Sequence, residues 1–229
     1  MNNLKKASLA AAATGVMVGT ADAAKRSGAK KRSGAEKRKG GAKRQAVDKL
    51  IGKIKDDSDK VRTEGWLGAG EVGAPAVKPL AEVMTDDDME VARAAKRALW
   101  KIVRHTGRPR AAGAKRAVEA KLVELLGDDQ PVSVRREVLW MLSEIGTFKA
   151  IKPIAGLLSN KRLREDARMV LERIPSPGAV KALKAALKAA PEDFKLNIAQ
   201  SLRKRGADVP GLPCMKLVPT KKTNVKPVT

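Results

Sequence analysis

A block of two short helices recurs about every thirty residues between Ala46 and Gly206. A period of this length predicts a stacked α-solenoid, in which each repeat covers the apolar face of its neighbour. Only the second interval departs from one period, because it carries an insertion. Solenoids usually bind partners along an extended surface. The aligned second helices begin near Val61, Val91, Val134, Leu163 and Phe194, which lie 30, 43, 29 and 31 positions apart.

The first helices and the turns repeat as well. Two of three aligned first helices place proline in the first turn, where its missing N–H breaks no hydrogen bond. The aligned segments are Val77-Lys78-Pro79-Leu80, Ile151-Lys152-Pro153-Ile154 and Val180-Lys181-Ala182-Leu183, and acidic turns lie at Asp86-Asp87-Asp88 and Asp128-Asp129-Gln130-Pro131. These residues resemble HEAT repeats, most closely the short HEAT-like type named after phycobilisome lyases. The resemblance implies an all-α fold, a right-handed α-α superhelix of about five helix pairs, whose second helices line the concave surface.

Composition argues against a sheet core and against common catalytic sites. Hydrophobic residues make up 43% of the chain, aromatic residues only 2%, and tyrosine is absent. The single cysteine, Cys214, excludes an intrachain disulfide and a cysteine-based zinc site. His105 is the sole histidine, and no phosphate-binding glycine loop or Ser/His/Asp set is recognisable. We therefore expect no catalytic residues, no metal and no cofactor.

Residues 1–23 have the pattern of a bacterial signal peptide. Two lysines precede a short apolar segment, which ends in the small-x-small sequence Ala21-Asp22-Ala23. The apolar segment is too short to span a bilayer, so we expect no transmembrane segment in the mature chain. Basic residues follow it at once, which favours retention on the cytoplasmic side instead. The expected location is periplasmic or secreted, with a cytoplasmic location as the alternative.

Export has a direct test at the N-terminus. If the leader is cleaved after Ala23, mass spectrometry of the native protein will find a chain that begins at Ala24. An intact N-terminus in a cytosolic fraction would contradict export.

The remaining chain divides into three parts. Residues 24–45 are rich in Lys, Arg, Gly and Ala and predict a disordered polycationic arm, either a tether to an anionic partner or a solubilising spacer. Residues 46–206 form the HEAT-like repeat domain. Residues 207–229 contain four prolines and four lysines and predict an extended tail.

Helical periodicity separates an apolar core face from a basic face on the second helices. The predicted core stripes are Val61, Gly65, Gly68, Ala69 and Val72 in the first repeat, Val91, Ala95, Ala98, Leu99 and Ile102 in the second, and Val134, Val138, Met141, Leu142 and Ile145 in the third. The face opposite the core carries Arg93, Arg97, Trp100 and Arg104 in the second repeat. Arg136 and Trp140 lie toward the corresponding face in the third repeat. The pattern predicts a basic, tryptophan-bearing groove. The alternative is that the tryptophans pack between repeats and the arginines form a solvated face.

The insertion between the second and third repeats adds further basic residues. The stretch from Arg104 to Arg116 contains no acidic residue, and its cations are Arg104, Arg108, Arg110, Lys115 and Arg116. Insertions in repeat proteins project as loops, often on the binding face. We expect such a loop here, or a longer linker with no binding role.

Charge then suggests the class of partner. The chain carries a net charge of +23, and residues 45–206 alone hold 32 Lys and Arg against 22 Asp and Glu. A basic fold attracts anionic partners at long range. The favoured interpretation is a noncatalytic, monomeric scaffold that binds an acidic protein or another polyanion. The alternative is a nucleic-acid-binding HEAT protein similar to the alkylpurine DNA glycosylases, although the sequence places no aspartate beside Trp100 or Trp140.

Overall fold

The computed structural model describes residues 40–214, and all regular structure in this range is helical. The predicted signal peptide, most of the basic arm and residues 215–229 of the predicted tail lie outside the described residues.

Within residues 40–214, five helix pairs follow one another, as the repeat predicts. The first pair is formed by residues 40–54 and α2 (Asp59–Val72), and the second by α3 (Val77–Val83) and α4 (Met89–His105). The other pairs are α5 (Ala112–Glu124) with α6 (Val132–Ile145), α7 (Ile151–Gly156) with α8 (Arg164–Arg173), and α9 (Pro177–Ala189) with α10 (Glu192–Lys204). Short 3-10 turns flank α3 and α7, at Ala74–Ala76, Phe148–Ala150 and Leu157–Ser159.

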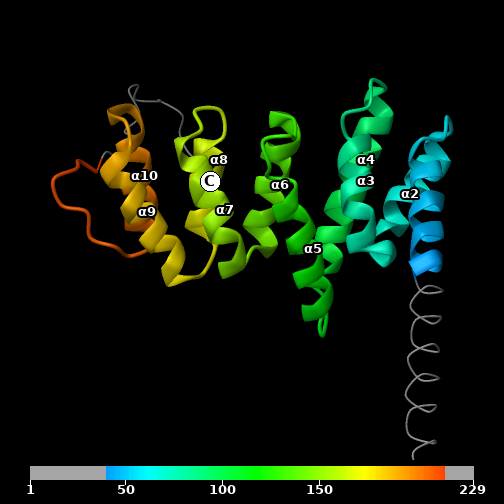
Figure 1. The fold of residues 1–229 in the computed structure, drawn as a ribbon, viewed down its shortest axis with the longest axis horizontal. Coiled ribbons are helices and arrows are strands. Elements are labelled where there is room, and N and C mark those ends of the chain that lie inside the picture. Colours follow the sequence, from blue (N-terminus) through cyan, green and yellow to red (C-terminus); the bar gives the residue numbers. More distant parts are fainter. Residues whose placement is uncertain (1–39, 215–229) are drawn as a thin grey trace, which may run out of the picture. The chain divides into compact units, whose positions relative to one another are not determined.

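The pairs stack side by side in sequence order, from α2 to α10 in Figure 1. Each second helix packs on the second helix of the next repeat, so that α2, α4, α6, α8 and α10 form one layer. First helices also meet across repeats, α3 with α5 and α7 with α9. The layer of second helices therefore presents one continuous surface, which we call the second-helix face.

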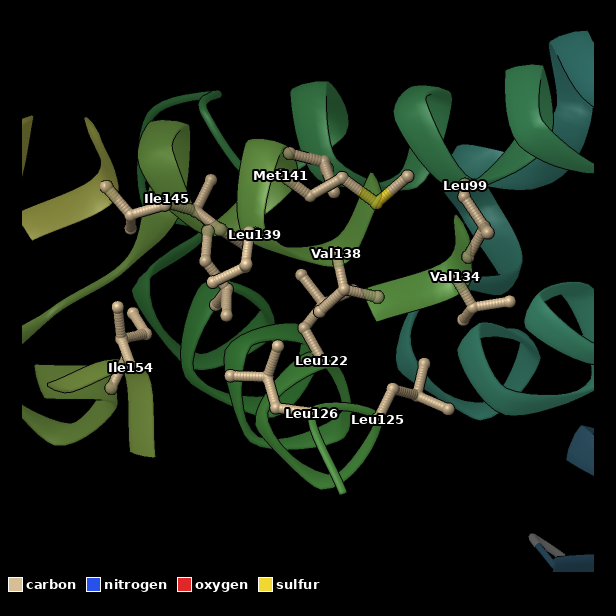
Figure 2. Packing of buried hydrophobic residues seen from close by; sticks show 14 of the residues in the cluster. Leu99, Leu122, Leu125, Leu126, Val134, Val138, Leu139, Met141, Ile145 and Ile154 are labelled. Atoms are coloured by element: carbon tan, nitrogen blue, oxygen red, sulfur yellow. The ribbon is translucent and has the colours of Figure 1, made fainter. Parts of the chain in front are cut away.

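The core lies between the two layers. In the third repeat all five residues of the predicted core stripe are buried, and so are all five in the second. Figure 2 shows Val138 and Leu139 of α6 above Leu122, Leu125 and Leu126, which come from α5 and the turn that follows it. Leu139 lies outside the predicted stripe and is also fully buried, because α6 packs against both neighbouring repeats and its own first helix.

The first repeat departs from its predicted stripe. Gly68 is exposed, whereas Gly70 is buried. A Cβ at Gly70 would lie 2.9 Å from Cγ of His105 on α4, and a Cβ at Gly65 would lie 3.0 Å from Cβ of Lys53. Two of the glycines in α2 therefore allow close approach of neighbouring helices. The expectation that Gly68 belongs to the core is wrong, because the helix face is set by these contacts.

The insertion does not form a long projecting loop. Part of it lengthens α4 to His105, a turn occupies residues 106–111, and α5 takes up the rest. In Figure 1 this green turn, next to α5, lies lower than the connections between the neighbouring helices. Lys115 and Arg116, predicted in a loop, lie in α5, because the sequence from Ala112 to Glu124 continues as a helix whose Val118 and Leu122 are buried.

The ends of the repeat array differ from the predicted boundaries. Residues 40–45 are already helical, so helical structure reaches into the range assigned to the arm. After α10 the chain is no longer helical, as the predicted extended tail requires. The first residues of this tail nevertheless pack on the last repeat. Arg203 donates hydrogen bonds to the carbonyl oxygens of Val209, Leu212 and Pro213, and Val209 is buried.

Candidate basic site on the second-helix face

A cavity of about 520 Å³ opens on the second-helix face at α2 and α4. We call it the α4 cavity. Its lining residues are Trp66 of α2 together with Arg93, Lys96, Arg97, Trp100, Lys101 and Arg104 of α4. Every residue of this set is a cation or a tryptophan, because the buried stripe of α4 turns most of its small and aliphatic residues the other way.

Two guanidinium groups of the cavity lie over indole rings. Cζ of Arg97 is 6.0 Å from the ring centroid of Trp66, and Cζ of Arg104 is 5.4 Å from that of Trp100. A guanidinium over an aromatic face is attracted to the ring and is held in a defined plane. The rings thus position two arginine side chains that would otherwise sample many rotamers.

The cations of the cavity differ in their partners. Arg93 pairs with Glu90 at 2.6 Å and Lys96 pairs with Glu137 at 2.7 Å. Within residues 40–214, no carboxylate lies at ion-pair distance from Arg97, Lys101 or Arg104. These three side chains give the cavity a positive potential, because no carboxylate within residues 40–214 pairs with them.

The other predicted site residues lie elsewhere. Arg136 and Trp140 lie at the junction between α6 and α8, where both bind Asp166 of α8. Arg108 and Arg110 are exposed in the turn after α4. Lys115 lines a separate cavity of about 370 Å³ near Thr147 and Arg173, and Arg116 is exposed on α5. The sequence prediction therefore groups residues that the structure divides among five places.

Trp100 and Trp140 both have carboxylate neighbours. The neighbour of Trp140 is an aspartate, which corrects the expectation that no aspartate lies beside it. Trp100 Nε1 donates to Glu137 at 2.6 Å, and Trp140 Nε1 donates to Asp166 at 3.0 Å. These acids come from the following repeat, so a search of the residues near each tryptophan on its own helix misses them. Asp166 also pairs with Arg136 at 3.1 Å, and this double pairing makes it a structural carboxylate between repeats.

Trp66 is a cavity residue that the sequence pattern of α4 did not predict. The available signal was the recurrence of tryptophan in three consecutive second helices, at Trp66, Trp100 and Trp140. Its ring is partly buried, and its buried Nε1 atom has no hydrogen-bond partner in the part of the chain that the structure describes.

The described residues show neither a metal site nor a membrane span. Between residues 40 and 214, no group of three or more His, Cys, Asp or Glu side chains is arranged to hold a metal ion. No helix in the same range has the length and apolar character needed to cross a bilayer.

Comparison with known proteins agrees with the fold. Residues 119–203 match the family model of HEAT repeats. None of the curated proteins matches the chain. Similar solved structures include a designed armadillo repeat protein in complex with the peptide (KR)4, with 21% identity, coverage of 68% of this chain and 80% of that one, and a TM-score of 0.41.

Two other designed proteins are similar to the same degree. A computationally designed armadillo repeat protein for modular peptide recognition has 20% identity over 68% of this chain and 80% of its own, with a TM-score of 0.39. An engineered protein has 22% identity over 70% and 80% of the two chains, with a TM-score of 0.38. Residues 119–203 thus match HEAT repeats, and the stacked helix pairs of residues 40–214 have a HEAT-like repeat fold.

Proposed function

We propose that this protein is a noncatalytic scaffold that binds an anionic partner, an acidic protein or another polyanion, through the α4 cavity. One observation carries the proposal: Arg97, Lys101 and Arg104 line one cavity and have no carboxylate partner within residues 40–214. Most other arginines of the second helices have such a partner, as Arg62, Arg135, Arg136, Arg164 and Arg168 do.

The indole rings support binding at this place. Arg97 and Arg104 are already held over Trp66 and Trp100, so less conformational entropy is lost when an anion engages them. A guanidinium also offers a planar pair of donors that fits carboxylate, sulfate or phosphate oxygens. The cavity is therefore suited to oxyanions in general.

The test replaces both arginines and keeps the rest of the chain. The double variant Arg97→Gln/Arg104→Gln is expected to bind heparin, a soluble polyanion, about tenfold more weakly than the parent, with a smaller dependence on salt. Isothermal titration calorimetry at several salt concentrations measures both quantities. Residues 1–39 stay in every variant, so the charge of the arm is constant.

A matched control removes the same charge elsewhere. Lys184 and Lys188 are exposed on α9, away from the α4 cavity. The variant Lys184→Gln/Lys188→Gln should bind heparin nearly as the parent does. Equal losses in the two double variants would show that only net charge matters, and the cavity would then have no specific role.

A further inference from the structure

At two junctions between second helices, α4–α6 and α6–α8, a carboxylate at one register position joins the two helices. This position is the third residue after each aligned helix start, and we call it the junction position. The aligned starts are Val91, Val134, Leu163 and Phe194. The junction position is occupied by Ala94 in α4, Glu137 in α6, Asp166 in α8 and Asn197 in α10.

At two junctions the carboxylate binds the preceding repeat in the same way. Glu137 accepts the indole N–H of Trp100 at 2.6 Å and pairs with Lys96 at 2.7 Å. Asp166 accepts the indole N–H of Trp140 at 3.0 Å and pairs with Arg136 at 3.1 Å. In each case one acidic side chain satisfies one indole and one cation of the repeat before it.

The junction between α2 and α4 has an indole from the repeat before it, but its cation comes from α4 and its junction position is not acidic. Trp66 presents a buried N–H that has no acceptor within residues 40–214, Arg97 of α4 lies over its ring, and the junction position is Ala94. A second cavity, of about 280 Å³, lies here and is lined by all three of these residues. Its two acids, Asp59 and Glu90, are paired with Arg62 and Arg93. A buried donor without an acceptor is unfavourable, so an incoming acceptor is stabilised there.

We propose that the α2–α4 junction binds a carboxylate side chain of an acidic polypeptide segment, which takes the place that Glu137 and Asp166 hold at the next two junctions. This inference rests on the proposed function and names its partner. Trp66 and Arg97 line both the α4 cavity and the smaller cavity, so a carboxylate that enters either one meets the same guanidinium.

The geometry of α4 favours an extended segment. Arg97, Lys101 and Arg104 follow one another along the helix at rises of about 6 Å and about 4.5 Å. Alternate residues of an extended chain point to the same side and are about 6.6 Å apart. A segment with acidic residues at alternate positions therefore places successive carboxylates near successive cations.

The same geometry disfavours nucleic acid. Base stacking needs an open aromatic face, and Arg97 and Arg104 already lie over Trp66 and Trp100. A stacked base would have to displace a guanidinium, whereas a carboxylate binds the guanidinium where it is. The observations thus favour acidic side chains over bases.

The experiment uses the full-length protein and three probes. The first is a synthetic peptide with Glu at alternate positions and Ser between them, and the second is an isomer whose Glu residues are contiguous. The third is an oligothymidine with the same number of charges. Fluorescence anisotropy should show the alternating peptide binding at least about threefold more tightly than either other probe. Tighter binding of the oligothymidine would overturn the inference.

Substitution at the junction position gives the sharpest test. Ala94→Glu supplies the missing carboxylate from within the chain, so it should weaken binding of the alternating peptide by about tenfold and raise the thermal midpoint of unfolding. Ala94→Gln adds nearly the same volume without charge and should lose less than about threefold. Equal losses in the two variants would show simple obstruction and would contradict the inference.

A second variant keeps the inference testable if glutamate at position 94 disturbs the fold. Trp66→Phe keeps a ring beneath Arg97 and removes the N–H, and it should weaken the alternating peptide by about threefold. In the parent, the indole N–H resonance that this substitution removes should shift when peptide is added. An unshifted resonance would count against a carboxylate at this place.

The two proposals can fail separately. If heparin binding depends on Arg97 and Arg104 while the junction variants bind peptide normally, only this inference fails. If heparin binding is also unchanged, the proposed function fails with it.

Discussion

Replacing Leu139 by alanine is expected to lower the free energy of unfolding by about 2–5 kcal/mol. Leu139 is fully buried on α6, at the centre of the array, where it contributes to the core shown in Figure 2. The lost methyl groups leave a cavity that the surrounding helices fill only in part. Urea denaturation followed by circular dichroism measures the effect.

Leu196 on α10 provides the matched comparison. Its side chain is 41% exposed, so alanine there removes less buried surface and should cost well under half as much. Equal losses at Leu139 and Leu196 would mean that the two layers do not share the core described here.

The second large effect is expected at Gly70. Alanine at this position would place a Cβ 2.9 Å from Cγ and 3.0 Å from Cβ of His105, so the His105 side chain or one of the two helices must shift. We expect Gly70→Ala to destabilise the protein by about 1–3 kcal/mol. Thermal unfolding of the parent and the variant, followed by circular dichroism at 222 nm, measures the difference.

Gly68 is the control, because it lies in the same helix and a methyl group added there would meet nothing within 4 Å. Gly68→Ala should stabilise the protein by about 0.5–1 kcal/mol, since alanine has the higher helix propensity. A combined Gly70→Ala/His105→Ala variant should recover part of the lost stability if the contact with His105 is the cause. Destabilisation by both single substitutions would contradict this account of α2.

The repeat itself could be predicted from the sequence because packing between repeats restricts the same positions in every copy. The buried stripes of α4 and α6 are an example, for all ten predicted residues are buried. The first repeat was harder. Periodicity places Gly68 in the apolar stripe of α2 and Gly70 on the opposite face, and only the position of His105 on another helix shows why Gly70 is buried instead.

The candidate site shows the same limit. Arg93, Arg97, Trp100 and Arg104 could be grouped from the sequence because they share one face of a single helix. Trp66 could not be added by that argument, since it reaches the α4 cavity from α2. The partners of Trp100 and Trp140 were missed for a similar reason: Glu137 and Asp166 lie 37 and 26 positions away along the chain.

The packing between repeats is uneven. α2 packs along α4 over much of its length, and α6 packs well on α8, whereas α4 and α6 meet over a much smaller area. The insertion lies at this joint, and the match to HEAT repeats begins just after it, within α5. Because neighbouring repeats supply most of the stability of a solenoid, bending of the array should be concentrated between α4 and α6.

Glu137 therefore has a mechanical role in addition to its local one. It fastens α6 to Trp100 and Lys96, and both of these residues line the α4 cavity. We expect an acidic ligand that draws Lys96 or Trp100 toward itself to compete with Glu137 and to loosen the contact between α4 and α6. Occupancy of the cavity would then change the curvature of the array through one carboxylate.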